Sequence, residues 1–238
     1  MSPKLDSTLL VPVDISAPEE FDKSLLELFG PMRVILLGYY PVPDQSAPEQ
    51  LRDEFEEQAA DALEEIADRF DEETEVKTVL VFTRDRETTV ERVGGEHNSD
   101  AVLISGEVED VEKVLVPIRG NPNIDNIADF VGALMQETDA TVTLFHVTED
   151  EHDERVSEFI LRGVADKLRE EGVDPERIDW EQRSGGSPKN EISEFAEEYD
   201  VLVMGETEPS LRKRIFGDIP STVVNELGIP VLIVRGEA

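Results

Sequence analysis

The residues whose types and spacing best fit binding chemistry lie near the end of this 238-residue chain. An apolar run leads into Gly205, a loop with three consecutive basic residues follows, and Gly217 precedes a segment that we expect to be a short helix. A strand, a glycine-bounded loop and a helix N-terminus together form a cradle for a phosphate, because main-chain N–H groups can reach the anion there. The candidate anion-binding residues of this stretch are Gly205, Arg212, Lys213, Arg214, Gly217 and Asp218.

The elements that must position this loop follow a regular alternation of strands and helices. Apolar runs predict strands at residues 8–13, 33–40, 76–82, 100–104, 113–118, 141–147, 200–204 and 230–234, and residues 178–183, which contain Trp180, are interpreted as a further strand. Apolar residues spaced three and four apart, with their flanking signals, predict helices at residues 19–29, 49–70, 86–96, 124–137, 153–170 and 188–198. Strands that alternate with helices form a parallel sheet covered on both faces. The predicted fold class is therefore α/β, with doubly wound, Rossmann-like parallel sheets.

The strand pattern restarts near the middle of the chain. Residues 113–118 echo residues 9–13, and residues 200–204 echo residues 100–104. We therefore predict two tandem domains, residues 1–110 and 111–238. The first lacks the glycine loop, the last helix and the last strand, so only the second could hold a complete phosphate cradle.

The second domain resembles the universal stress protein family along its whole length. The likeness is carried by residues 114–117, 144–147, 185–186, 200–205 and 230–234, together with Pro188 and Ile192. The resemblance implies a five-stranded doubly wound sheet with nucleotide in the crevice at the carboxyl ends of the strands. It also implies a loop with a glycine, two residues, a second glycine, nine residues and a glycine before Ser or Thr. An Asp after the first strand would contact the adenosine end.

The sequence departs from that nucleotide-binding pattern in four places. Glu208 stands where the second glycine is expected, and the loop to Gly217 is one residue short. Asp218 replaces the hydroxyl residue and would place a carboxylate in the anion site. Arg119, two residues after Pro117, stands where the adenosine-side Asp belongs, whereas the first domain keeps that residue as Asp14. Pro117 and Arg119 complete the candidate nucleotide-binding set, and neither domain has every part of the family site.

The charge of the chain limits its partners. It contains 56 acidic and 22 basic residues, for a net charge of −34, and the acidic residues are spread through the helical segments. Such a surface disfavours nonspecific binding to nucleic acid or anionic lipid. The even spread resembles that of proteins from salt-in halophiles, so the chain looks like a tandem universal stress protein of the haloarchaeal type. We expect it to be less stable in dilute buffer than in molar salt, which screens self-repulsion.

Other residue types exclude several classes of site. The chain has no cysteine, no apolar run of the ~20 residues that span a membrane, and no apolar region of a signal peptide at its start. We therefore expect a cytoplasmic protein without membrane insertion. The three histidines, His97, His146 and His152, lack metal-ligand spacing, and His146 is interpreted as packed or hydrogen-bonded. Trp180 is interpreted as a core or interface residue.

These observations favour a regulatory or stress-response binding module over an enzyme, because the sequence shows neither a complete phosphate loop nor a catalytic set. Whether ATP or AMP binds stays open. The basic residues 212–214 could neutralise phosphate oxygens, or they could pair with Glu206, Glu208 and the acidic helices. Two partners are expected. One is a second copy that pairs through residues 230–234, whose apolar edge would otherwise be exposed. The other is a regulatory protein or a transporter.

Overall fold

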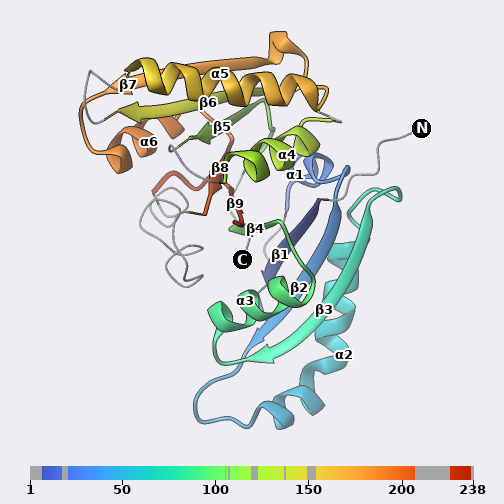
Figure 1. Ribbon diagram of the computed structural model, residues 1–238. Helices are drawn as coiled ribbons and strands as arrows, with labels where there is room; N and C mark the ends of the chain where they lie inside the picture. The colour runs from blue at the N-terminus through green and yellow to red at the C-terminus, as the bar shows by residue number, and fades with distance from the viewer. Residues whose placement is uncertain are drawn as a thin grey trace.

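Strands and helices alternate along most of the described chain (Figure 1). The computed structural model describes residues 7–17, 21–104, 106, 108–118, 123–136, 138–148, 154–206 and 226–236. We call the residues before 111 the N-terminal half and the others the C-terminal half. The N-terminal half contains β1 (Thr8–Asp14), α1 (Lys23–Leu28), β2 (Arg33–Pro41), α2 (Pro48–Ala67), β3 (Glu75–Thr83), α3 (Arg86–Glu96) and β4 (Ala101–Ile104). The C-terminal half contains β5 (Lys113–Pro117), α4 (Ile124–Leu134), β6 (Thr141–Thr148), α5 (Glu154–Glu170), β7 (Ile178–Ser184), α6 (Pro188–Ala196), β8 (Val201–Gly205) and β9 (Val231–Val234).

Local signals in the sequence begin and end the helices. Asp85 caps α3 by accepting a hydrogen bond from the backbone N–H of Thr88 at 3.0 Å. Gly172, with φ of +95°, follows α5, in the left-handed conformation that glycine adopts readily. The first helix is shorter than the predicted 19–29. It begins at Lys23 because Asp22 supplies the cap, accepting a hydrogen bond from Ser24 N at 3.0 Å.

The described strands form one nine-stranded sheet in the order β3-β2-β1-β4-β9-β8-β5-β6-β7. Neighbouring strands are parallel within each half, as the alternation of strands and helices predicts. The two halves run in opposite directions, since β4 and β9 pair antiparallel. Each half therefore contributes the same run of four strands, β3-β2-β1-β4 and β7-β6-β5-β8, and β9 lies between the two runs.

The position of β9 overturns the prediction that residues 230–234 pair with a second copy. Its register with β4 joins Leu103 to Leu232 and Ala101 to Val234. On its other side it pairs with β8, which joins Val203 to Leu232. Both edges of β9 are thus filled within the chain. The apolar edge that motivated the dimer does not exist, and among the described strands the free sheet edges belong to β3 and β7.

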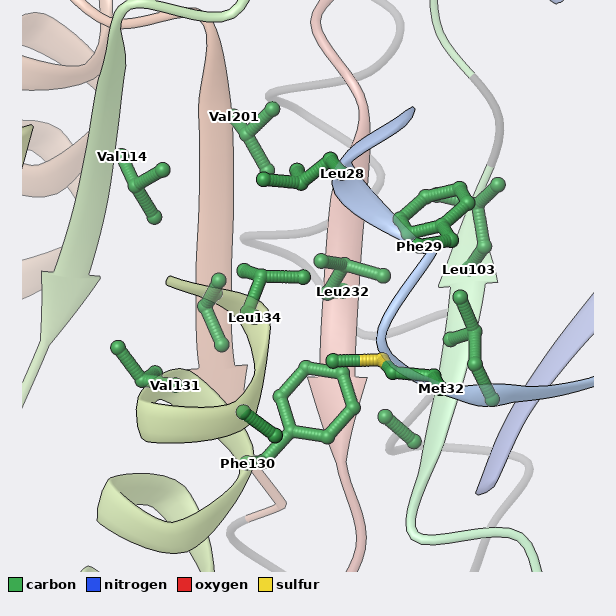
Figure 2. Close-up of a cluster of buried hydrophobic side chains, with 14 of the residues drawn as sticks. Leu28, Phe29, Met32, Leu103, Val114, Phe130, Val131, Leu134, Val201 and Leu232 are labelled. Carbon is green, nitrogen blue, oxygen red and sulfur yellow. The ribbon is translucent and has the colours of Figure 1, made fainter. Parts of the chain in front are cut away.

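The hydrophobic core continues across this junction. Figure 2 shows Phe29 and Met32 from the N-terminal half close to Phe130 and Leu134 of α4, around Leu232 of β9. All five side chains are at least 98% buried. This face of the sheet is covered by α1, α2, α4 and α5, whereas α3 and α6 contribute to the core on the other face. On each face of the sheet the buried cluster contains residues of both halves, so the halves do not have separate cores.

Two aspartates make matching hydrogen bonds in the two halves. Asp100, just before β4, accepts a hydrogen bond from Thr8 N of β1 at 2.7 Å. Asp200, just before β8, accepts from Lys113 N of β5 at 2.8 Å. Each carboxylate ties the start of the fourth strand of its half to the start of the first.

Candidate functional site

The candidate site lies where β5 and β8 end and α4 begins. The two strands are adjacent and parallel, with Val114 opposite Val201 and Leu115 opposite Leu202, so they finish at the same edge of the sheet. The chain leaves β5 for β6 on one side, while β8 and β9 lie on the other. In open α/β sheets such a switch in strand order leaves a crevice at the carboxyl ends, and ligands bind there.

The β5 side of the crevice is built from backbone and one histidine. Pro117 is the buried last residue of β5. The next residue, Ile118, donates its N–H to the carbonyl of Phe145 at 2.7 Å, and its own carbonyl contacts Nδ1 of His146. His146 is half-buried. The prediction that His146 is packed or hydrogen-bonded is confirmed.

Two asparagines at the start of α4 bind the end of β9. Asn123 precedes the helix and is 6% exposed, and its Nδ2 donates to the carbonyl of Val234 at 3.3 Å. Asn126 donates in the same way to the carbonyl of Arg235 at 3.4 Å. The Oδ1 atom of Asn123 is buried and has no hydrogen-bond partner among the described residues.

A carboxylate occupies the β8 side of the crevice. Glu206 follows β8 directly and is only 7% exposed. Its backbone N–H donates to the carbonyl of Val234 at 2.8 Å, which extends the pairing with β9. Its Oε2 accepts from the backbone N–H of Gly236 at 2.9 Å. The backbone N–H of Gly236 is therefore already hydrogen-bonded to a side chain of this chain.

The packing around residue 205 leaves room only for a glycine. A Cβ on this residue would lie 2.5 Å from Cδ1 and 3.2 Å from Cγ1 of Ile127, a core residue of α4 that is 3% exposed. The close approach of β8 to α4 thus requires a glycine here whether or not a ligand binds. A phosphate-binding glycine and a packing glycine give the same sequence signal, and only the geometry reveals the packing role.

The structure brings together two of the predicted site residues, Pro117 and Gly205, at the ends of adjacent strands. The remaining predicted residues lie outside the described part of the chain: Arg119, Arg212, Lys213, Arg214, Gly217 and Asp218.

Sequence reasoning missed Asn123, Glu206 and Gly236 as members of the site. A signal existed for two of them. An asparagine directly before a predicted helix is a common cap, and a carboxylate directly after a buried strand end is costly to bury without a hydrogen bond. Glu206 was considered only as a partner for the basic loop residues. Gly236 could not be found, because its role depends on β9 lying beside β8.

The corresponding edge of the N-terminal half is built differently. Asp14, the last residue of β1, accepts hydrogen bonds from the N–H and the hydroxyl of Ser16, at 3.0 and 2.6 Å. Beyond β4, a Cβ on Gly106 would lie 2.4 Å from the carbonyl oxygen of Gly228, in the segment that leads into β9. Backbone of the C-terminal half therefore packs directly against the segment that follows β4.

Other candidate features are weaker. Within the described residues no group of three His, Asp or Glu side chains is arranged to hold a metal. No described helix is both long and apolar enough to cross a membrane. An open depression of about 540 Å³ lies beside α1 in the N-terminal half, bordered by Gly106 and by the exposed side chains of Lys23 and Arg69. Trp180 of β7 is 42% exposed, so it is not a core residue.

The sequence of the C-terminal half is similar to that of known proteins. The model of the universal stress protein family matches residues 110–235, just over half of the chain. Universal stress protein G of Shigella flexneri is 40% identical over 65 residues, which are 26% of this chain and 45% of that protein. The protein of the same name from Salmonella typhimurium is 38% identical over 65 residues, with the same coverage. The chain thus matches less than half the length of these curated relatives.

Solved structures extend the likeness to the whole fold. A universal stress protein from Archaeoglobus fulgidus has a TM-score of 0.66, with 17% identity over 97% of both chains. A functionally unknown protein from Pseudomonas aeruginosa has a TM-score of 0.50, with 15% identity over 97% of this chain and 92% of that one. At these identities the likeness shows the fold alone. The family match, however, covers the strands, the helices and the crevice of the C-terminal half, and the chain belongs to the universal stress protein family.

Proposed function

We propose that this chain is a regulatory or stress-response binding module with a degenerate nucleotide site, which does not hold ATP in the pose usual for its family. The observation that carries the proposal is the buried carboxylate of Glu206, which accepts a hydrogen bond from Gly236 N at 2.9 Å in the crevice. An anionic side chain in this place opposes a second anion.

Electrostatic magnitudes support this reading. Two unit charges 4–5 Å apart repel by about 1 kcal/mol in water and by about 4 kcal/mol at the effective dielectric near a protein surface. Nucleotide phosphates near Glu206 would meet this penalty, and they would have to compete with its carboxylate for the N–H of Gly236. The sequence adds Glu208 and Asp218 to the same loop. The basic residues 212–214 could offset this repulsion by attracting the phosphates, so nucleotide binding must be tested directly.

The wider proposal concerns the organisation of the chain. We interpret the two runs of four strands as tandem domains, residues 1–110 and 111–238, of which the first lacks the last helix and strand. The matching roles of Asp100 and Asp200 support the repeat. On this interpretation the first domain retains Asp14 from a nucleotide site and the second retains Gly205, so neither holds all of its parts.

Further parts of the proposal follow from charge and family. A net charge of −34 fits a cytoplasmic protein of the haloarchaeal type that avoids nucleic acid and is stabilised by molar salt. A non-enzymatic role fits the lack of a catalytic set in the sequence, and a regulatory protein or a transporter is the proposed partner. A melting temperature that stays constant between dilute buffer and molar KCl would contradict the salt-adapted part.

The deciding experiment is calorimetric titration of the chain with ATP and with AMP in molar KCl. We expect no saturable heat at millimolar nucleotide. The variant Glu206→Gln removes the negative charge and keeps the shape of the side chain, so it measures how much of the exclusion is electrostatic. Saturable binding to the unaltered chain, lost on Arg212→Ala, would instead establish a nucleotide-binding stress protein that uses the modified loop 205–218.

A further inference from the structure

The described sheet ends in two free edges, β3 in the N-terminal half and β7 in the C-terminal half. A free edge exposes unpaired backbone donors and acceptors to which another strand can add. Proteins usually protect such an edge with charged side chains, because an uncharged edge recruits other strands. The two edges of this molecule occupy equivalent places, so they can be compared residue by residue.

The β7 edge is protected. Asp179, Glu181 and Arg183 alternate along its seven residues, and Arg183 forms ion pairs with Glu181 and Glu191. Its one large apolar side chain between Ile178 and the end of the strand is Trp180. Charges at every second position make this strand a poor template for pairing.

The β3 edge carries charges only at its start, where Glu75 and Lys77 are exposed and Glu75 forms an ion pair with Arg33. Its last six residues, Thr78 to Thr83, read Thr-Val-Leu-Val-Phe-Thr and contain no charge, although a third of the whole chain is charged. Five of the six are β-branched or aromatic, the types that favour strands. Composition alone thus distinguishes this edge from the rest of the surface.

The side chains of β3 are also incompletely covered. Leu80 and Phe82 border the core on the α2 face, and Val79 and Val81 border the core on the α3 face. All four are half-buried. A strand added beside β3 would extend the sheet and cover these side chains on both faces at once, in addition to supplying backbone hydrogen bonds.

The charge beside this edge indicates the kind of strand that fits. The helix α2 packs against β3 and lies beside it in Figure 1. It carries eight acidic residues and a single basic one, Arg52, and all nine are exposed. An incoming segment with Lys or Arg at its ends would be attracted to this helix. A second copy pairing through its own β3 would bring a second acidic α2 to the same place, which like-charge repulsion opposes.

We infer that the β3 edge binds an extended segment of another protein by strand addition, and that this segment is β-branched or apolar in its middle and basic at its ends. This is a known mode of peptide recognition, in which backbone hydrogen bonds supply affinity and the alternating side chains supply specificity. The inference names a partner class for the proposed binding module. It uses none of the crevice residues, so nucleotide exclusion and peptide binding can fail independently.

The test uses a fluorescein-labelled synthetic peptide, Lys-Lys-Thr-Val-Thr-Val-Thr-Val-Lys-Lys, titrated with the full chain and followed by fluorescence anisotropy in 0.1 M KCl. We expect saturable binding that weakens at least tenfold on Val81→Glu and when the Lys residues of the peptide are replaced by Glu. The same peptide methylated on alternate backbone nitrogens keeps its side chains and charge, and it should bind at least tenfold more weakly, because strand addition needs those N–H groups.

Two variants keep this test decisive. Trp180→Ala alters the other sheet edge and should leave the peptide affinity unchanged. Leu80→Lys places a charge on the opposite face of β3 from Val81→Glu and should also weaken binding, so the result does not depend on one variant folding. Unaltered binding of the methylated peptide, loss of binding in Trp180→Ala, or no binding to the unaltered chain would overturn the inference. A dimer by light scattering that Val81→Glu abolishes would overturn it in favour of a second copy.

Discussion

Among the described strands, the two halves repeat the same run of four, and a fifth strand of the C-terminal half, β9, lies between the two runs and pairs with both. In the C-terminal half β9 extends the parallel run beyond β8. For the N-terminal half it supplies the neighbour of β4, in antiparallel register. The N-terminal half therefore needs no fifth strand of its own, because β9 of the C-terminal half pairs with β4.

The same comparison separates the two crevices. The N-terminal half keeps a carboxylate at the end of its first strand, Asp14, but the backbone of Gly228 packs against Gly106 beyond its fourth strand. The C-terminal half keeps Gly205 at the end of its fourth strand and places Glu206 next to it. The ends of the first and fourth strands therefore carry different residues in the two halves, as the proposed division of the nucleotide site requires.

The largest expected effect on stability follows from shortening a buried side chain of β9, the strand that pairs with both halves. Leu232 is fully buried in the core at the junction, so Leu232→Ala should lower the free energy of unfolding by about 2–5 kcal/mol. Urea denaturation followed by circular dichroism measures this loss. Phe159→Ala removes more apolar surface, but from a side chain that is 79% exposed, and it should change stability by less than about 0.5 kcal/mol. Equal losses in the two variants would show that β9 is not a core strand of both halves.

The next largest effect on stability is expected from the glycines at the ends of the fourth strands, Gly205 in β8 and Gly106 after β4. Gly205→Ala would place a Cβ 2.5 Å from Cδ1 of Ile127, and overpacking of this kind costs about 1–3 kcal/mol. The double variant with Ile127→Val lacks that Cδ1 atom and should recover part of the loss. Gly106→Ala meets the carbonyl oxygen of Gly228, which is backbone, so truncating a neighbouring side chain cannot relieve it. Failure of Ile127→Val to recover any stability would mean that Gly205 is required for something other than packing.

The regular elements were predictable because their signals are local. Every described strand lies within a few residues of a predicted one, and helical spacing predicted the positions of α2, α3, α4, α5 and α6 equally closely. The predicted start of α1 was wrong because a helix start depends on which side chain caps it, and here Asp22 accepts the hydrogen bond from Ser24 N. Residues 207–225 lie outside the described part of the chain, so the predicted helix near Asp218 stays a prediction.

The position of β9 in the sheet could not be predicted from such local signals. A central strand and an edge strand that pairs between chains both need apolar residues on two faces, so residues 230–234 look alike in either role. The distinction depends on β4 ending beside β9, which is a long-range fact. Glu206 and Gly236 were missed for the same reason, because their hydrogen bond exists only once β8 and β9 are adjacent.

The smallest expected effect contrasts two equivalent positions, Ser99 before Asp100 and Tyr199 before Asp200. Ser99 contacts the guanidinium of Arg235, whereas burial raises the pKa of the Tyr199 phenol, which packs against Phe195. A pKa raised on folding stabilises the protein fully below the unfolded value of about 10, and that contribution is lost as the pH rises through the folded pKa. The free energy of unfolding of the unaltered chain should therefore fall more steeply above pH 10 than that of Tyr199→Phe. Parallel pH profiles would contradict this assignment.

The claim that β9 unites the two halves is tested most directly by following urea unfolding with two probes. Trp180 is the only tryptophan and lies in the C-terminal half, so its fluorescence reports that half alone. Far-ultraviolet circular dichroism reports the helices and strands of both halves. Since one core spans the junction, we expect the two signals to change at the same urea concentration, in a single transition. Two separate transitions, with the fluorescence following only one of them, would show that the halves fold independently and would contradict the account.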